Sequence, residues 1–218
     1  MNGGGAGIRI LADSAGSFIF GANTTITNPS GPAFTITSST AGVTYLGTLN
    51  QSTAGALALA VSTHSAGTLD FSGATLNVTG GFGLAFNDAD GTYSFGKAAL
   101  SGGAGIGIVN GSAGSFTFGS GTSVTNAAGA AIGIANSTAG VTYSGSISQS
   151  TAGMAAIDVS AHSTGALNFA GATIAATGGT GLAFNDADGT YSFGAVALSG
   201  GARLGLLGGS AGSFTFGD

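Results

Sequence analysis

Apolar side chains alternate with small or polar ones along most of the chain. In one unit the alternating segments are residues 8–11, 17–20 and 24–27, and in a later unit they are residues 83–86, 92–95 and 98–100. A period of two places successive side chains on opposite faces, which is the pattern of a β-strand. Clusters of Gly, Ser, Thr and Asn separate the segments, and the sequence has no helix-length periodic stretch with capping residues. The pattern predicts an all-β fold with three short strands in each unit.

The units follow one another at a nearly constant interval. A glycine opens each aromatic-tipped segment, and the intervals between these glycines are 26, 25, 24 and 23 residues, followed by the same four values again. The glycines are Gly16, Gly42, Gly67, Gly91, Gly114, Gly140, Gly165, Gly189 and Gly212. Self-similarity at about 20–50 residues is typical of solenoids and other arrays, whose units bury their apolar faces by stacking. One unit therefore takes about 24 residues.

A longer repeat contains the shorter one. The sequence GLAFNDADGTYSFG occurs unchanged at residues 83–96 and 181–194, an offset of 98 residues. Four units make one such superrepeat. We expect residues 1–218 to form a single domain without a linker, and to be a fragment of a longer array of the same kind.

A regular cycle of strands joined by short turns is best explained by a chain wound into a three-faced coil. Equivalent strands of successive turns then pair in parallel, and the sequence allows eight full turns and part of a ninth, about nine in all. At a spacing of ~4.8 Å between neighbouring strands, this predicts a β-solenoid rod roughly 40 Å long.

This winding predicts columns of inward side chains. The first strand contributes two columns, one of Ile8, Phe34, Leu57, Leu84, Ile106, Ile132, Ala155, Leu182 and Leu204, and one of Ile10, Ile36, Leu59, Phe86, Ile108, Ile134, Ile157, Phe184 and Leu206. The second strand contributes Phe20, Tyr45, Phe71, Phe95, Phe118, Tyr143, Phe169, Phe193 and Phe216. The third contributes Ile26, Leu49, Leu76, Leu100, Val124, Ile147, Ile174 and Leu198. Aromatic rings in neighbouring turns can stack in an offset manner.

Composition narrows the range of partners. Glycine supplies 44 of 218 residues and hydrophobic residues supply 43%, so a core is available despite the glycine content. The net charge is −5, and the scattered cations Arg9, Lys97 and Arg203 form no basic stripe for nucleic acid. No apolar run approaches the ~20 residues that cross a bilayer, and we expect no membrane insertion by this segment. The opening MNGGGAG does not resemble a signal peptide, and the absence of cysteine fits a protein that folds after export.

The sequence Asp88-Ala89-Asp90-Gly91, repeated at 186–189, resembles a calcium loop at first sight. An EF-hand register anchored on Gly91 would place Phe86 at the first ligand position, and the chain has no Glu to close the loop. Other units carry Ser-Ala-Gly at this corner, so we interpret the segment as a turn whose side chains bond their own backbone. Weak calcium binding is the alternative. We otherwise expect no metal site and no cofactor.

The two histidines, His64 and His162, occupy equivalent corners four turns apart. At the strand spacing they lie roughly 19 Å from each other, too far to share a metal ion. We expect exposed turn histidines. Catalytic carboxylates are also disfavoured, because Asp70, Asp88 and Asp158 stand mostly alone and no turn carries a long insertion. We therefore expect that the chain is not an enzyme.

The iteration of these motifs carries a family resemblance. Segments such as NDADGTYSF and SAGSFTF, each followed by alternating strands, resemble the β-strand repeats of bacterial autotransporter and filamentous-adhesin passengers over essentially the whole chain. The resemblance implies a right-handed parallel β-helix at the cell surface or in the extracellular space, used as a stalk or adhesive surface. A host or environmental surface, or a glycan, would then be its partner. No binding residue carries over from the resemblance.

A rival function is ice binding. The outward positions of the second strand form a column of short hydroxyl side chains: Ser17, Thr44, Thr68, Thr92, Ser94, Ser115, Thr117, Thr142, Ser144, Thr190, Ser192, Ser213 and Thr215. Regular hydroxyls and methyls on a flat face could order water. Against this, β propensity alone favours Thr in strands, and the column is interrupted by Ile19, Leu46, Asp70, Ala166 and Asn168. A glycan-binding or glycan-cleaving β-helix is a third possibility.

The two ends of the solenoid have apolar strands in the same phase of the repeat. SAGSFIF at 14–20 and SAGSFTF at 210–216 are 196 residues apart, which is twice 98. Solenoids expose core and strand edges at their ends unless these are covered. We therefore expect end-to-end association between copies of this chain.

Overall fold

The computed structural model describes residues 5–217, and all of their regular secondary structure is β. The first sheet has nine parallel strands in the order β1-β4-β7-β9-β11-β14-β17-β19-β21. Its strands are β1 (Ile8–Ile10), β4 (Phe34–Thr37), β7 (Leu57–His64), β9 (Gly83–Ala89), β11 (Gly105–Val109), β14 (Ile132–Ser137), β17 (Ala155–His162), β19 (Gly181–Ala187) and β21 (Arg203–Leu207). Within the described part of the chain, no helix has the length and apolarity to span a membrane.

The second sheet has thirteen strands and covers the other two sides of the coil. Its strands are β2 (Ser17–Phe20), β3 (Thr25–Thr27), β5 (Gly42–Tyr45), β6 (Thr48–Gln51), β8 (Thr68–Val78), β10 (Thr92–Leu100), β12 (Ser115–Phe118), β13 (Ser123–Thr125), β15 (Gly140–Tyr143), β16 (Ser146–Gln149), β18 (Ala166–Thr177), β20 (Thr190–Ser199) and β22 (Ser213–Phe216). All pairings in both sheets are parallel.

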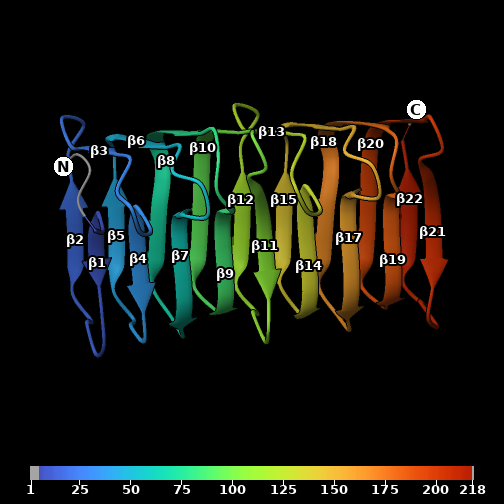
Figure 1. Cartoon of the computed structure of the whole chain (residues 1–218). Coiled ribbons are helices and arrows are strands. Elements are labelled where there is room, and N and C mark those ends of the chain that lie inside the picture. Colours follow the sequence, from blue (N-terminus) through green and yellow to red (C-terminus); the bar gives the residue numbers. More distant parts are fainter. Residues whose placement is uncertain (1–4, 218) are drawn as a thin grey trace.

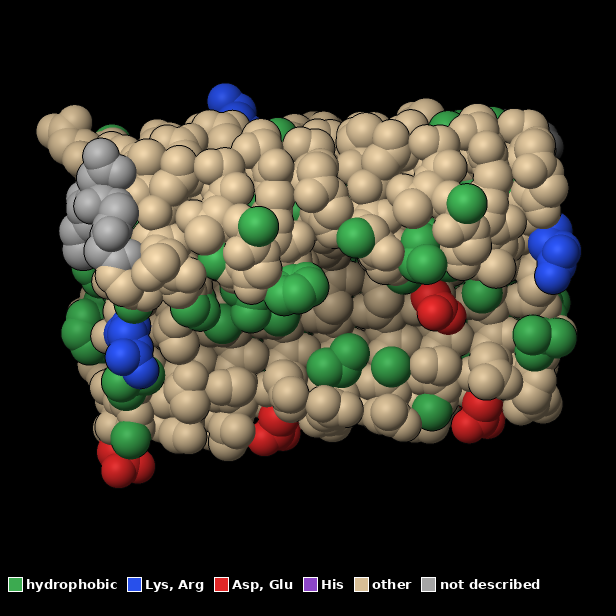
Figure 2. Space-filling view, in the orientation of Figure 1, with side chains coloured by type: hydrophobic (Ala, Val, Ile, Leu, Met, Phe, Trp, Pro, Cys, Tyr) green, Lys and Arg blue, Asp and Glu red, His purple; other side chains and the backbone are tan. Residues whose placement is uncertain are grey.

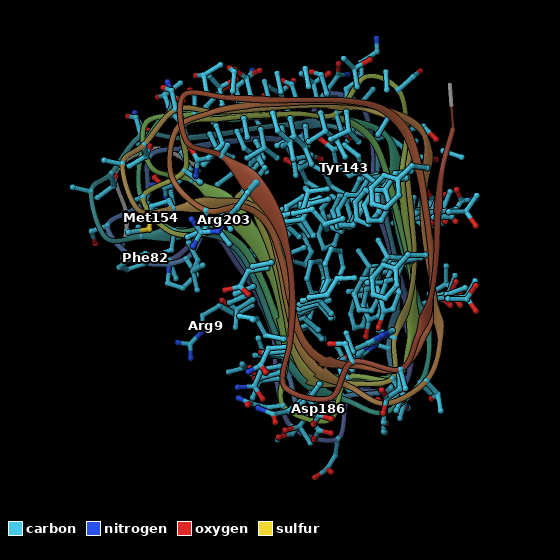
Figure 3. The ribbon with its side chains drawn as sticks, turned by 90° about the vertical axis from the view of Figure 1, so that its right-hand side faces the viewer. Arg9, Phe82, Tyr143, Met154, Asp186 and Arg203 are labelled. Atoms are coloured by element: carbon cyan, nitrogen blue, oxygen red, sulfur yellow. The ribbon has the colours of Figure 1, made fainter. Side chains whose placement is uncertain are left out.

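The chain is a β-solenoid of about eight stacked turns, close to the nine that the repeat predicts. Successive turns follow one another along the rod from the N-terminal to the C-terminal end (Figure 1). The prediction of three separate strands per turn is confirmed in the turns whose second and third strands are distinct, such as the turn with β2 and β3. In β8, β10, β18 and β20, however, the second and third strands are continuous and bend through an irregularity in register. An end-on view shows how these segments enclose the core (Figure 3).

Inward side chains form the expected continuous core. Ile106 lies opposite both Leu84 and Ile132, and Ile108 lies opposite Phe86 and Ile134. The aromatic column stacks as predicted between its phenylalanines, whereas the rings of Tyr45 and Tyr143 are tilted against their neighbours by 32° to 50°. The ring centroids of Phe95 and Phe118 are 5.1 Å apart with an interplanar angle of 10°, and those of Phe169 and Phe193 are 5.5 Å apart at 3°. Such stacking adds about 1 kcal/mol per pair beyond the burial of the rings.

The predicted columns of the first strand are wrong in register at two turns. Leu59, and not Leu57, lies opposite Phe34 and Leu84, while Val61 lies opposite Phe86. In the second superrepeat Ile157 replaces Ala155 in the same way, and Val159 lies opposite Phe184. Leu57 and Ala155 lie before a bulge near the start of β7 and of β17, and the regular inward column begins two residues later than the alternation predicts.

The third column also shifts by two residues. Leu76 lies opposite Ala98 and not Leu100, whereas Leu100 lies opposite Val78 and Val124. In the second superrepeat Ile174 lies opposite Val196, and Leu198 lies opposite Ala176. Both shifts follow from the bends in β8, β10, β18 and β20, where the count of residues differs between neighbouring turns.

The corner after the first sheet has an unusual backbone. A column of residues there adopts φ between 47° and 60°, in the left-handed region: Ser38, Thr63, Asp88, Asn110, Asn136, Ala161, Asp186 and Gly208. This conformation breaks the strand alternation and turns the following side chain inward. Ser39, His64, Ala89, Ser137, His162 and Ala187 are buried as a result. Non-glycine residues in this region cost on the order of 1 kcal/mol or more, so stacked neighbours must hold them there.

Two glutamines hold the opposite corner of the coil. Gln51 and Gln149 are buried, and the side-chain Nε2 of each donates hydrogen bonds to backbone carbonyls of the loop in the preceding turn. The distances from Gln149 Nε2 to the carbonyl oxygens of Ala127 and Gly129 are 3.1 and 2.9 Å. The amide thus satisfies carbonyls that the bend leaves without a ladder partner.

Candidate functional site

The hydroxyl column forms two parallel ranks on one flat side of the rod, which we call the hydroxyl face. Figure 3 shows the two rows end-on, outside the strands whose inner side carries Tyr143. One rank contains Ser17, Thr68, Thr92, Ser115, Thr190 and Ser213, and the other contains Thr44, Ser94, Thr117, Thr142, Ser192 and Thr215. Ser144 lies one residue beyond β15, at the corner. Within a rank, hydroxyls of paired strands are ~4.8 Å apart.

The interruptions in these ranks have a structural reason. The side-chain oxygen Oδ1 of Asp70 accepts a hydrogen bond from the backbone N–H of Ser72 at 2.9 Å. Asn168, its equivalent, accepts one from Ala170 at 3.0 Å. Both bonds hold the bend between the second and third segments. Ile19, Gly42, Gly140 and Ala166 also occupy positions in the ranks without a hydroxyl. Among the described residues, both ranks are therefore complete only at β10 and β12, and again at β20 and β22.

The outer side of the first sheet carries a lengthwise groove. Figure 2 shows the hollow along the middle of this side, with hydrophobic side chains in it, and acidic side chains along the lower edge of the molecule. One part of it, about 420 Å³, is lined by Phe82, Gly107, Gly133 and residues 128–130. The corner that bears Phe82 and Met154 projects beyond the sheet and forms one wall (Figure 3). The Phe82 side chain is 67% exposed.

The side chains on the floor of the groove are unusually small. Four consecutive turns place Ala60, Ala85, Gly107 and Gly133 opposite one another on the outer side of the sheet. A Cβ added at Gly107 would meet no atom within 4 Å, and at Gly133 the nearest atom would be Ala130 Cβ at 3.8 Å. The fold therefore does not require glycine at these two positions. Glycine inside a strand weakens it and often marks a place where a ligand approaches the backbone.

One carboxylate lies on this floor. Asp158 of β17 is opposite Gly133 of β14 and Ala183 of β19. Partial burial raises the pKa of this carboxyl above its usual value. The remaining outward positions of the first sheet include the polar residues Ser62 and Asn87. The groove thus combines an apolar floor and wall with a few hydrogen-bonding groups, which is the usual composition of a ligand site.

The histidines are not exposed, contrary to the expectation from the sequence. The side chains of both His64 and His162 are 0% exposed. The residues before them, Thr63 and Ala161, have left-handed φ of 49° and 47°, which turns each imidazole into the core. Neither Thr nor Ala is typical of this conformation, so it could not be predicted from the sequence.

Each histidine bonds a carbonyl of the preceding turn and a tyrosine of the following turn. Nδ1 of His64 lies 2.8 Å from the Tyr93 hydroxyl, and Nε2 lies 3.1 Å from the carbonyl oxygen of Ala41. A carbonyl only accepts, so Nε2 carries the hydrogen and Nδ1 accepts from the tyrosine. The tyrosine oxygen in turn accepts from the backbone N–H of Gly91 at 3.1 Å. At His162 the distances to Tyr191 and Ala139 are 2.9 and 3.1 Å.

Burial governs the acid–base chemistry of this network. It lowers the pKa of His64, and the bond to the Ala41 carbonyl and the charge of Asp90 oppose the effect only in part. Burial likewise lowers the pKa of His162 and raises the pKa of Tyr93 and Tyr191. The neutral imidazole and the neutral phenol are therefore the stable forms inside the fold.

The Asp-Ala-Asp-Gly segment forms a corner of the coil, as expected, but the carboxylates of Asp90 and Asp188 bond the backbone of the next turn and not their own backbone. Asp88 is one of the left-handed corner residues, with φ of 54°. Oδ1 of Asp90 accepts a hydrogen bond from the N–H of Ala113 in the next turn at 3.0 Å, and Asp188 accepts one from Ala211 at 2.9 Å. Within residues 5–217, no three His or Asp side chains are grouped so that they could hold a metal ion.

Comparison with known proteins adds no relative from which a role could be transferred. The chain matches none of the protein-family models, curated proteins or solved structures with which it was compared.

Proposed function

We propose that this chain is an extracellular structural or adhesive β-solenoid segment of a repetitive bacterial surface protein. It acts by presenting surfaces and not by catalysis. The observation that carries the proposal is the uninterrupted stacking of near-identical turns from β1 to β21, which gives the rod long, even faces. Short corners, the lack of cysteine and the resemblance of the repeated motifs to those of bacterial surface proteins support the same interpretation.

Antibody labelling of the producing cells tests the proposed location. Antibodies raised against the 218-residue chain are expected to label intact cells as strongly as permeabilised ones, while an antibody against a cytoplasmic protein labels only the permeabilised cells. A strain that lacks the gene is expected to adhere less to surfaces. Labelling that requires permeabilisation would refute the extracellular role.

The groove on the first sheet is the contact surface that we assign to a glycan. Its apolar floor and Phe82 suit the C–H faces of sugar rings, and Asp158 and Asn87 suit their hydroxyls. Of the three cations, Lys97 lies on another side, opposite Thr75, and Arg9 of β1 and Arg203 of β21 lie at the two ends of the grooved sheet, whereas the only charged side chain described on the middle of the floor is the acidic Asp158. An uncharged glycan therefore suits the groove better than a polyanion.

Filling the groove tests this assignment. Gly107→Val with Gly133→Val places side chains on the floor where the fold has room. Affinity for neutral oligosaccharides such as cellohexaose or chitohexaose, measured by calorimetry, is expected to fall about tenfold or more. The control Gly140→Val makes the same change on the hydroxyl face, where the nearest atom is 3.9 Å away, and should leave binding unchanged. Equal binding by the filled and control variants would contradict the assignment.

Ice binding is the second candidate, because two ranks of hydroxyls lie on one flat face. Paired hydroxyls are regular over two turns at Thr92, Ser94, Ser115 and Thr117. Inhibition of ice recrystallisation by the wild-type chain, lost in Thr92→Lys with Thr117→Lys, would support it. If the wild-type chain leaves crystal growth unchanged, the hydroxyls serve solubility and β propensity alone.

A further inference from the structure

The two histidine–tyrosine pairs are buried titratable groups that the proposed function does not use. Both pairs lie at the corner between the first sheet and the hydroxyl face, 98 residues apart. Each imidazole joins its own corner to the preceding turn through a carbonyl and to the following turn through a tyrosine. Each therefore connects three consecutive turns at one point.

The ring is also tightly enclosed. A Cβ added at Gly91 would lie 2.9 Å from His64 Nδ1, and one added at Gly189 would lie 2.9 Å from the His162 ring. The glycines thus let the backbone of the next turn lie directly against the imidazole. Water cannot solvate a protonated ring unless this corner moves.

Few charged groups face the pair. Tyr93 of β10 and Asp90 of the corner before it face His64, and Asp88 and Asp90 act on Tyr93. At the second copy, Tyr191 of β20 faces His162, and Asp188 acts on Tyr191. The equivalent buried position in the preceding turns is an uncharged serine, Ser39 or Ser137. No other imidazole takes part, since the chain has only two histidines.

We propose that His64 and His162 are acid-sensitive locks that fasten this corner when neutral and release it when protonated. A proton from solvent adds to Nδ1, the atom that accepts the tyrosine hydrogen bond. The ring then has no lone pair for the tyrosine and carries a buried charge, so the corner opens to hydrate it. The ladders of the two sheets, which do not depend on the imidazole, stay paired. This conformational device goes beyond the proposed surface role.

The direction of the pH dependence follows from burial. The open corner has a histidine of ordinary pKa, about 6.5, and the closed corner has a lower one. The lock is therefore fully closed above pH ~6.5 and weakens as the pH falls. As the pH falls, each histidine raises the equilibrium constant for opening of its corner by about tenfold per pH unit, until the imidazole of the closed corner is itself protonated.

Amide exchange measured by NMR tests the locks. After correction for intrinsic exchange rates, protection of the Gly91 and Gly189 amides is expected to fall between pH 6.5 and pH 5. Protection of the Leu84 and Leu182 amides, in the ladder of the first sheet, should stay constant. The imidazole ¹⁵N shifts should report hydrogen on Nε2 and a pKa below 6.5 for both rings.

His64→Gln is the matched variant, because its amide can accept from Tyr93 and donate to Ala41 without titrating. His64→Gln should abolish the pH dependence of amide protection at Gly91 and leave the pH dependence at Gly189 intact. His162→Gln should abolish it at Gly189 and leave it intact at Gly91. If the Gln variants keep the wild-type dependence, or if the wild-type rings titrate at 6.5 or above, the proposal is overturned. A uniform loss of protection that includes Leu84 and Leu182 would also overturn it, because the acid effect would then be global.

Discussion

Leu59 lies opposite Leu84 in the first sheet, whereas Leu57, two residues earlier, lies opposite Gly83. A bulge near the start of β7 separates the two pairings. The bulge adds a residue without disturbing the inward column beyond it, so turns of different length still share one core. Register in this rod is thus set by the buried face and not by a fixed number of residues per turn.

Substitutions at Leu84 and Ala85 test this register. Leu84 is buried, and Ala85 points to the outer side of the same strand. Leu84→Asp is expected to cost several kcal/mol and unfold neighbouring turns, because it buries an unpaired carboxylate. Ala85→Asp should change the free energy of unfolding by less than about 1 kcal/mol. Urea denaturation measures both, and equal tolerance of the two changes would refute the assigned ladder.

The tyrosines predict a loss of stability at alkaline pH. Burial raises the pKa of Tyr45 from 10.0 to about 12, and burial also raises the pKa of Tyr143. A raised pKa in the fold contributes stability that is complete below pH 10 and is lost as the pH rises toward the folded value. The denaturation midpoint should therefore fall between pH 10 and pH 12. Tyr45→Phe should make this fall shallower, and an unchanged profile would contradict the prediction.

The Asp-Ala-Asp-Gly turns are expected to work without calcium. Asp90→Ala removes the acceptor for the Ala113 N–H and should cost about 1 kcal/mol. Thermal melts of the wild-type chain in excess calcium and in EDTA should coincide. A rise of several degrees with calcium that disappears in Asp88→Asn with Asp186→Asn would identify a metal site that our interpretation rejects.

Self-association is expected through the apolar ends of the rod. On β21 and β22, Leu204 is 40% exposed and Phe216 is 43% exposed, whereas their equivalents Ile106 and Phe118 are buried by the next turn. We propose that a second copy supplies that cover. Sedimentation should show association that rises with concentration and is lost in Phe214→Lys with Phe216→Lys. Thr215→Lys, which points outward, is the control, and a monomer at every concentration would contradict the proposal.

Alternation and repeat were sufficient to predict the coil, the parallel stacking and the aromatic column, because these depend only on which side chains must be buried. They were insufficient where the backbone leaves the strand conformation at a residue that is not typical of turns. Thr63 and Ala161 adopt left-handed φ, so His64 and His162 were wrongly expected on the surface. The bends in β8 and β18 join two expected strands into one.

The hydroxyl face could be predicted from the sequence, because outward positions alternate with inward ones along each strand. The groove did not, since its wall is a corner whose projection depends on tertiary packing. Gly107 and Gly133 were the available signal: both are glycines within strands that neither a positive φ nor a close contact requires. Sequence alone does not separate such glycines from those at corners, such as Gly83, whose φ is 80°.

The 98-residue offset has a consequence for the gene. Gly83 lies opposite Gly105 just as Gly181 lies opposite Arg203, so equivalent residues of the two superrepeats meet equivalent neighbours. Unequal crossing-over between the DNA stretches that encode residues 83–96 and 181–194 would add or delete 98 codons. The product would be a rod longer or shorter by four whole turns, roughly 19 Å, with every column rejoined in phase. Inheritable changes in length that arise by this recombination would therefore come in steps of this size.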